Sequence, residues 1–173
     1  MEMSDPEITE NDLKFLVTLC ILSLKDLGYI HRDQIRSWGI VFKEECEERG
    51  VLGGTLLNDG VQGILINPNA KKDNILSTIA HEAVHLIQFM KGDAQNGQGY
   101  GEIVWKGETH KVLPGNHENH AEYDSQPWEE EAYRLAPQIV ADLRKVPIDQ
   151  ITQVWLTYGA SQWSLGLFTN IRW

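Results

Sequence analysis

Cysteine is scarce in this chain, and long apolar runs and an excess of positive charge are missing. The 173 residues include two cysteines, Cys20 and Cys46, which match neither a disulfide framework nor a cysteine-type zinc site and so fit a reducing compartment. The densest apolar stretch, 15–24, is much shorter than the roughly 20 residues of a membrane-spanning helix. The acidic start lacks the positive charge of a secretory signal. We expect a soluble cytoplasmic protein with no membrane partner.

The charge balance also restricts the class of partner. Acidic residues outnumber basic ones by 25 to 15, which gives a net charge of −10. Such a charge repels phosphate backbones, so nucleic acid is not an expected partner. Hydrophobic residues make up 42% of the chain and include six tryptophans, enough for a sizeable core. At this length, residues 1–173 are expected to form a single domain.

Helical spacing of apolar residues predicts four helices. The segments are 9–28, 33–49, 74–91 and about 126–145. Gly28, Gly50 and Gly92 lie at the ends of the first three, as is typical of helix ends. Pro137 lies inside the fourth segment and is expected to kink or shorten that helix.

Aliphatic and β-branched runs that flank turn-forming residues predict two hairpins. The first spans 51–66 around Asn58-Asp59-Gly60, and the second spans 102–112 around Lys106-Gly107. The Gly- and Asn-rich segment 92–101 is expected to be a loop. The resulting fold class is α+β, with a small, mostly antiparallel sheet packed on an N-terminal helical layer and on the helix 74–91.

The helix 74–91 contains the motif His81-Glu82-Ala83-Val84-His85. Histidines at positions i and i+4 lie on one helix face and can bind one Zn²⁺, while Glu82 can reach a metal-activated water. The alternative is a helix that carries two incidental surface histidines. We favour the metal site because the histidines would otherwise place polar groups on a largely apolar helix.

A catalytic zinc normally has three protein ligands, and Glu129-Glu130-Glu131 could supply the third. Successive helical residues are turned by about 100°, so only one of the three can face the metal. Glu129 is preferred because it shares a face with the small residues Ala132 and Ala136, which allow close helix packing; Glu131 is the second choice. Acidic residues in a first helical turn are also favoured by the helix dipole without any metal.

These motifs resemble those of the zincin metallopeptidases, specifically the gluzincin branch. The matching residues are His81-Glu82-Ala83-Val84-His85 and Glu129-Glu130-Glu131-Ala132, and about residues 50–145 are similar to small single-domain metallopeptidases of phages and bacteria. The resemblance implies a zincin-like fold, a zinc cofactor held by His81, His85 and Glu129, Glu82 as general base, and a polypeptide substrate. It also implies an edge strand, Gly63 to Asn67, that binds the substrate as an added strand. The longer acidic-helix signature of thermolysin-type enzymes is absent.

Several assignments stay open at this level. The donor that stabilises the oxyanion could be Tyr123, His120 or Tyr133. The stretch His117-Glu118-Asn119-His120 could bind metal, although a solvated loop is the more common outcome for such a sequence. Two other functions compete with a zinc peptidase: a catalytically silent, zinc-stabilised binding or virion-associated protein, and a regulatory protein that binds a partner through an acidic face.

Overall fold

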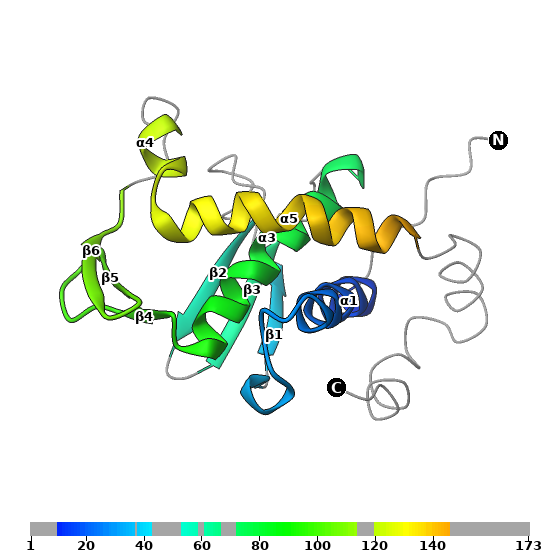
Figure 1. The fold of residues 1–173 in the computed structure, drawn as a ribbon, viewed down its shortest axis with the longest axis horizontal. Helices are drawn as coiled ribbons and strands as arrows, with labels where there is room; N and C mark the ends of the chain where they lie inside the picture. Colours follow the sequence, from blue (N-terminus) through cyan, green and yellow to red (C-terminus); the bar gives the residue numbers. More distant parts are fainter. Residues whose placement is uncertain are drawn as a thin grey trace.

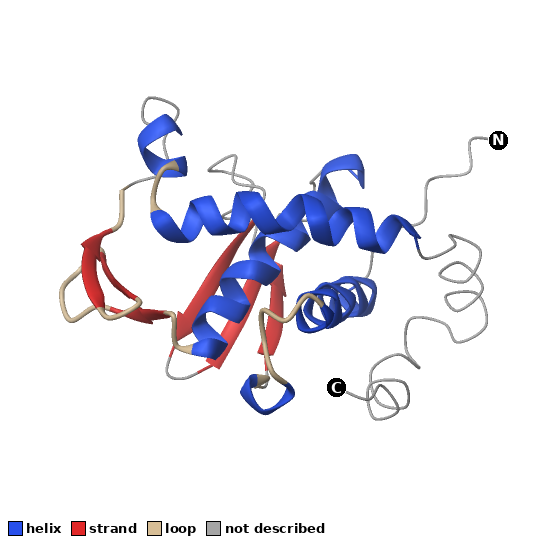
Figure 2. Cartoon of the chain, viewed as in Figure 1, coloured by secondary structure: helices blue, strands red, loops and turns tan. Residues whose placement is uncertain are grey.

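The structure is a computed structural model that describes residues 10–36, 38–42, 53–58, 61–66, 72–113 and 120–145. Its helices are α1 (Glu10–Asp26), the short 3-10 helix η1 (Arg32–Gln34), α3 (Lys72–Lys91), α4 (His120–Asp124) and α5 (Pro127–Lys145). Its strands are β1 (Trp38–Phe42), β2 (Gly53–Asn58), β3 (Val61–Ile66), β4 (Ala94–Asn96), β5 (Glu102–Trp105) and β6 (Glu108–Lys111). Figure 2 shows the resulting α+β architecture.

The helices predicted at 9–28, 74–91 and 126–145 are confirmed as α1, α3 and α5. Gly28 and Gly92 follow α1 and α3 with φ values of 81° and 79°, a left-handed conformation that glycine adopts without a steric penalty. Pro137 does not shorten α5, which continues to Lys145.

The predicted helix 33–49 is wrong where the structure describes it. Residues Trp38–Phe42 form strand β1, which pairs in parallel with β3 from Trp38↔Gln62 to Phe42↔Ile66. The run Trp-Gly-Ile-Val-Phe is rich in aromatic and β-branched residues, and the glycine weakens a helix at its centre. Pairing with a distant strand therefore outweighed the helical spacing of the apolar side chains. The acidic part of the segment lies outside the described residues.

The first predicted hairpin is confirmed by antiparallel pairing of β2 with β3, from Gly53↔Ile66 to Asn58↔Val61. The first sheet has the strand order β1-β3-β2 and is mixed. Strands β4, β5 and β6 form a second, antiparallel sheet in that order, so three of the four strand pairs among the described residues are antiparallel. Strand β3 has a partner on each side. Gly63 and its neighbours in β3 therefore cannot be the free edge strand expected for substrate, and Asn67 lies outside the described residues.

The second hairpin is confirmed as β5 and β6. Lys106 and Gly107 both have positive φ values, 48° and 88°, as a tight two-residue turn requires. The segment 92–101 is not entirely a loop, because Ala94–Asn96 forms β4 and pairs with β5. The hairpin packs through Trp105 against Trp128 at the start of α5, with ring centroids 6.3 Å apart.

Helix α3 lies against β2 and β3, and both α1 and α5 pack on α3 (Figure 1). The main core contains apolar side chains from all three helices and from β3. Its fully buried members include Val17, Ile21, Leu24, Ile64, Ile79, Leu86, Ala132 and Ile139. This arrangement brings the first turns of α5 onto the middle of α3, where the histidine motif lies.

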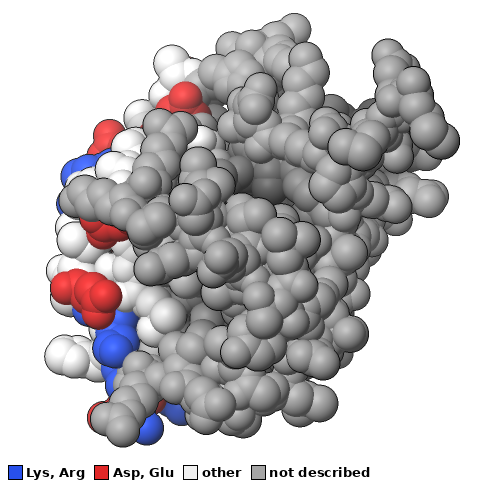
Figure 3. Space-filling view, turned by 90° about the vertical axis from the view of Figure 1, so that its right-hand side faces the viewer, with Lys and Arg blue, Asp and Glu red and all other residues white. Residues whose placement is uncertain are grey.

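The surface of the described segments does not carry one sign of charge throughout. On the described part of the face drawn in Figure 3, acidic and basic side chains lie beside one another. Within these segments no helix combines the length and the apolar character needed to cross a membrane.

Candidate metal centre

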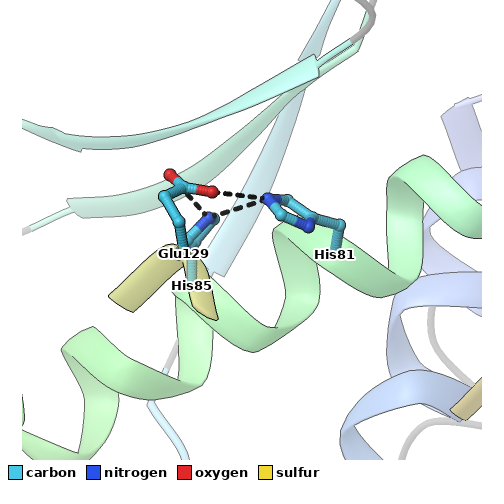
Figure 4. A group of neighbouring side chains, drawn as sticks. All are labelled: His81, His85 and Glu129. Carbon is cyan, nitrogen blue, oxygen red and sulfur yellow. Dashed lines mark hydrogen bonds and ion pairs between the residues drawn. The ribbon is translucent and has the colours of Figure 1, made fainter. Parts of the chain in front are cut away.

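His81 and His85 lie on one face of α3, one helical turn apart, as the motif predicts. Their side chains point toward each other and toward Glu129 of α5 (Figure 4). His81 Nε2 lies 3.1 Å from His85 Nε2 and 3.0 Å from Glu129 Oε2, and His85 Nε2 lies 3.4 Å from Glu129 Oε1. Three potential ligands from two helices thus form one compact cluster.

Glu129 reaches the histidines because α5 packs closely on α3. Ala132 is fully buried and Ala136 nearly so, and neither side chain holds the two helices apart. Glu129 itself is only 3% exposed, whereas Glu130 is exposed to solvent. The preference for Glu129 over Glu131 as the neighbour of the histidines therefore agrees with the geometry.

Glu131 lies beside the cluster rather than in it. Its carboxylate accepts a hydrogen bond from Gln88 Nε2 at 2.9 Å and lies 3.8 Å from Lys106 Nζ and 3.9 Å from an Arg134 guanidinium nitrogen. Glu129 and Glu131 thus occupy different positions around α5, as their separation by about 200° on that helix requires.

The cluster is strongly coupled electrostatically. Burial alone would lower the pKa of His85, but the hydrogen bond to Glu129 and the charges of Glu82 and Glu129 raise it to about 9. Burial alone would raise the pKa of Glu129, but the hydrogen bonds and charges of His81 and His85 lower it to about 2. The carboxylate of Glu129 is therefore ionised at neutral pH and favours the protonated form of His85.

Glu82 and two tyrosines surround this cluster. Glu82 is buried on α3, and its charge contributes to the raised pKa values of His85, Tyr123 and Tyr133. Tyr123 is partly buried; burial, the charge of Glu129 and a hydrogen bond to that carboxylate raise its pKa above the usual range. The Tyr133 ring lies 4.7 Å from the His81 ring and is half-exposed. Of the three expected oxyanion donors, these two lie beside the cluster.

The third, His120, begins α4, and its side chain lies outside the described residues, as do residues 117–119. The alternative metal site in that stretch is therefore not described. Trp105 and Trp128 are buried against each other and do not belong to the cluster.

Gln88 is a site residue that the sequence reasoning missed. It is 2% exposed, and its side-chain oxygen lies 2.9 Å from His85 Nδ1. Its amide nitrogen donates to the Trp128 carbonyl at 3.0 Å and to Glu131. The signal was present in the spacing, because residue 88 follows His85 by three positions and so lies on the same helix face.

The donor set fits a divalent transition metal. Zinc bonds of about 2.0–2.2 Å in tetrahedral geometry place neighbouring ligand atoms roughly 3.3–3.5 Å apart, and the three distances here are 3.0, 3.1 and 3.4 Å. Two imidazoles and one carboxylate are also a donor combination typical of catalytic zinc. A single proton could bridge only two of the three groups, whereas a metal ion can bind all three.

The chain was compared with protein-family models, with curated proteins and with solved structures. None of the three comparisons finds a match.

Proposed function

We propose that this protein is a zinc-dependent peptidase with a zincin-like active site. The observation that carries the proposal is the convergence of His81, His85 and Glu129 from two helices, with the acidic side chain of Glu82 buried next to them. A purely structural zinc site has no need of a neighbouring general base and usually has four protein ligands. Among the described residues, the cluster offers three.

Zinc held by His81, His85 and Glu129 would supply Lewis-acid chemistry to a water molecule and to a peptide carbonyl. Glu82 takes the proton of the attacking water as general base and then returns it to the leaving amine. Tyr123 keeps its proton at neutral pH, because its pKa is raised, and can therefore donate a hydrogen bond to the developing oxyanion. Tyr133 is a second donor with the same property, with a pKa raised to about 12 by burial and by Asp124.

The test compares wild-type protein with Glu82→Gln after both have been loaded with zinc. The assay is the appearance of new peptide termini, measured by mass spectrometry, in a peptide library made by digesting a whole proteome. We expect new termini with the wild-type protein and none with Glu82→Gln, while both proteins bind one zinc per chain. Equal cleavage by the two proteins would show that Glu82 is not the base.

A zinc-stabilised binding or virion-associated protein is the second candidate. It is favoured by the burial of Glu129 between α3 and α5, because a metal at this point would cross-link the two helices. Zinc binding without any cleavage of the library by the wild-type protein would support this function and reject the peptidase. A chain that binds no zinc would favour the third candidate, the regulatory protein.

A further inference from the structure

Both the nitrogen and the oxygen of the Gln88 side-chain amide have defined partners. The amide nitrogen faces two acceptors, the Trp128 carbonyl at 3.0 Å and the Glu131 carboxylate at 2.9 Å. The amide oxygen must therefore face His85 Nδ1, which lies 2.9 Å away. The opposite rotamer would place the oxygen against two other oxygens, so the orientation of Gln88 is fixed.

An amide oxygen can only accept a hydrogen bond, so His85 Nδ1 must carry a proton and donate it to Gln88. The other ring nitrogen, Nε2, faces His81 and Glu129. When the ring is neutral, its lone pair is therefore on the nitrogen that faces the cluster. A neutral ring with the opposite tautomer could not bind a metal through Nε2.

We propose that Gln88 is a positioning residue that fixes the ring orientation and tautomer of His85 for metal binding, and that Glu131 and the Trp128 carbonyl fix Gln88 in turn. This inference rests on the metal site of the proposed function but not on peptidase activity. Glu131 then has a different role from the one considered in the sequence analysis. It does not bind the metal itself but holds Gln88, which orients the metal ligand His85.

The hairpin contributes to the same network. Trp128 supplies the backbone carbonyl, and its side chain is buried against Trp105 of β5. Lys106, in the turn that follows β5, lies 3.8 Å from Glu131. The second sheet therefore anchors the first turn of α5, from which both the carbonyl and the carboxylate reach Gln88.

The first test measures zinc affinity by competition with a chromogenic zinc chelator. Gln88→Met keeps a side chain of similar length but removes the hydrogen bonds, and we expect it to bind zinc 10- to 100-fold more weakly than the wild type. Gln95→Met is the matched control, because Gln95 lies on β4 with its side chain exposed and donating to the Gly92 carbonyl. We expect this control to keep wild-type affinity. Wild-type affinity in Gln88→Met would overturn the proposal.

A reciprocal exchange provides the second variant. Gln88→Glu alone faces Glu131 with a like charge, and we expect weak zinc binding and a lower melting temperature. In Gln88→Glu combined with Glu131→Gln, the carboxylate at 88 accepts from His85 while the amide at 131 donates to it. One oxygen at 88 still faces the Trp128 carbonyl, so we expect part of the affinity to return. If the folded double variant binds zinc no better than Gln88→Glu, the proposed network is wrong, even where Gln88→Met fails to fold.

Nuclear magnetic resonance separates this inference from the metal site itself. In chelator-treated wild-type protein, we expect a slowly exchanging His85 Nδ1–H signal that is lost in Gln88→Met and kept in Gln95→Met. If wild-type protein shows this signal and binds no zinc, the metal site fails while the hydrogen-bond network stands. If it binds zinc and lacks the signal, the role of Gln88 fails while the metal site stands.

Discussion

The ion pairs of Glu129 with His81 and His85 predict that the stability of the metal-free protein depends on pH. The pKa of His85 is about 9 in the folded chain, against an ordinary value of 6.5. Because the folded-state pKa is raised, the stabilisation is fully present below about pH 6.5 and is lost as the pH rises through about 9. Each unit by which the pKa differs between the folded and unfolded states corresponds to about 1.4 kcal/mol. The free energy of unfolding should therefore fall by up to about 3 kcal/mol between pH 6.5 and 10. For a chain of this size, that loss lowers the melting temperature by roughly 6–12 °C.

Urea unfolding in the presence of a chelator, repeated across this pH range, measures the effect. Glu129→Gln removes the main partner of His85 and should flatten the pH profile, whereas Glu130→Gln, at the exposed neighbouring position, should leave it unchanged. Groups elsewhere that titrate near pH 10 contribute to all three proteins and cancel in the comparison. Parallel profiles for wild type and Glu129→Gln would refute the coupling. On the acid side, Glu129 has a lowered pKa, so its contribution is present above about pH 4.5 and is lost as the pH falls toward 2.

Three further predictions concern the metal and the packing around it. Zinc binding at pH 7.5 should release close to one proton, because His85 is protonated in metal-free protein. Calorimetry in buffers of different ionisation enthalpy measures the number of protons released, and a value of zero would contradict the raised pKa of His85. Ala132→Leu overfills the contact between α3 and α5, so it should lower the free energy of unfolding by about 1–3 kcal/mol and weaken zinc binding. Ala141→Leu, at an exposed position of α5, should do neither in the same unfolding and chelator assays. Gly107→Ala forces a side chain into the left-handed region and should cost about 1–2 kcal/mol in denaturant unfolding, and an unchanged midpoint would show that the turn relaxes.

The parts of the fold that were predictable depend on local patterns. Helix α3 has regular apolar spacing and a glycine at its end, and the turns at 58–60 and 106–107 contain residues that favour tight hairpins. Strand β1 was not predictable in the same way, because its partner β3 lies more than twenty residues away and its apolar spacing also fits a helix. The position of β3 in the middle of the sheet follows from that pairing and was missed for the same reason.

In the candidate site too, the residues that follow local patterns were predictable, and those that depend on long-range contacts were not. His81 and His85 follow from a five-residue pattern, and Glu129 followed from the small residues that share its helix face. The role of Gln88 depends on two partners in α5, Trp128 and Glu131, and no pattern within α3 identifies them. Long-range contacts of this kind require the packing of the two helices to be known.

The distance along the chain between the histidines and Glu129 has a consequence for biosynthesis. His81 and Glu129 are 48 residues apart, so a ribosome completes the histidine motif well before the third member of the cluster emerges. A nascent chain that ends before α5 can offer a metal ion two imidazoles at most from this cluster, and it therefore holds the ion weakly. Any chemistry that needs all three groups is thus delayed until α5 has been synthesised and has docked on α3.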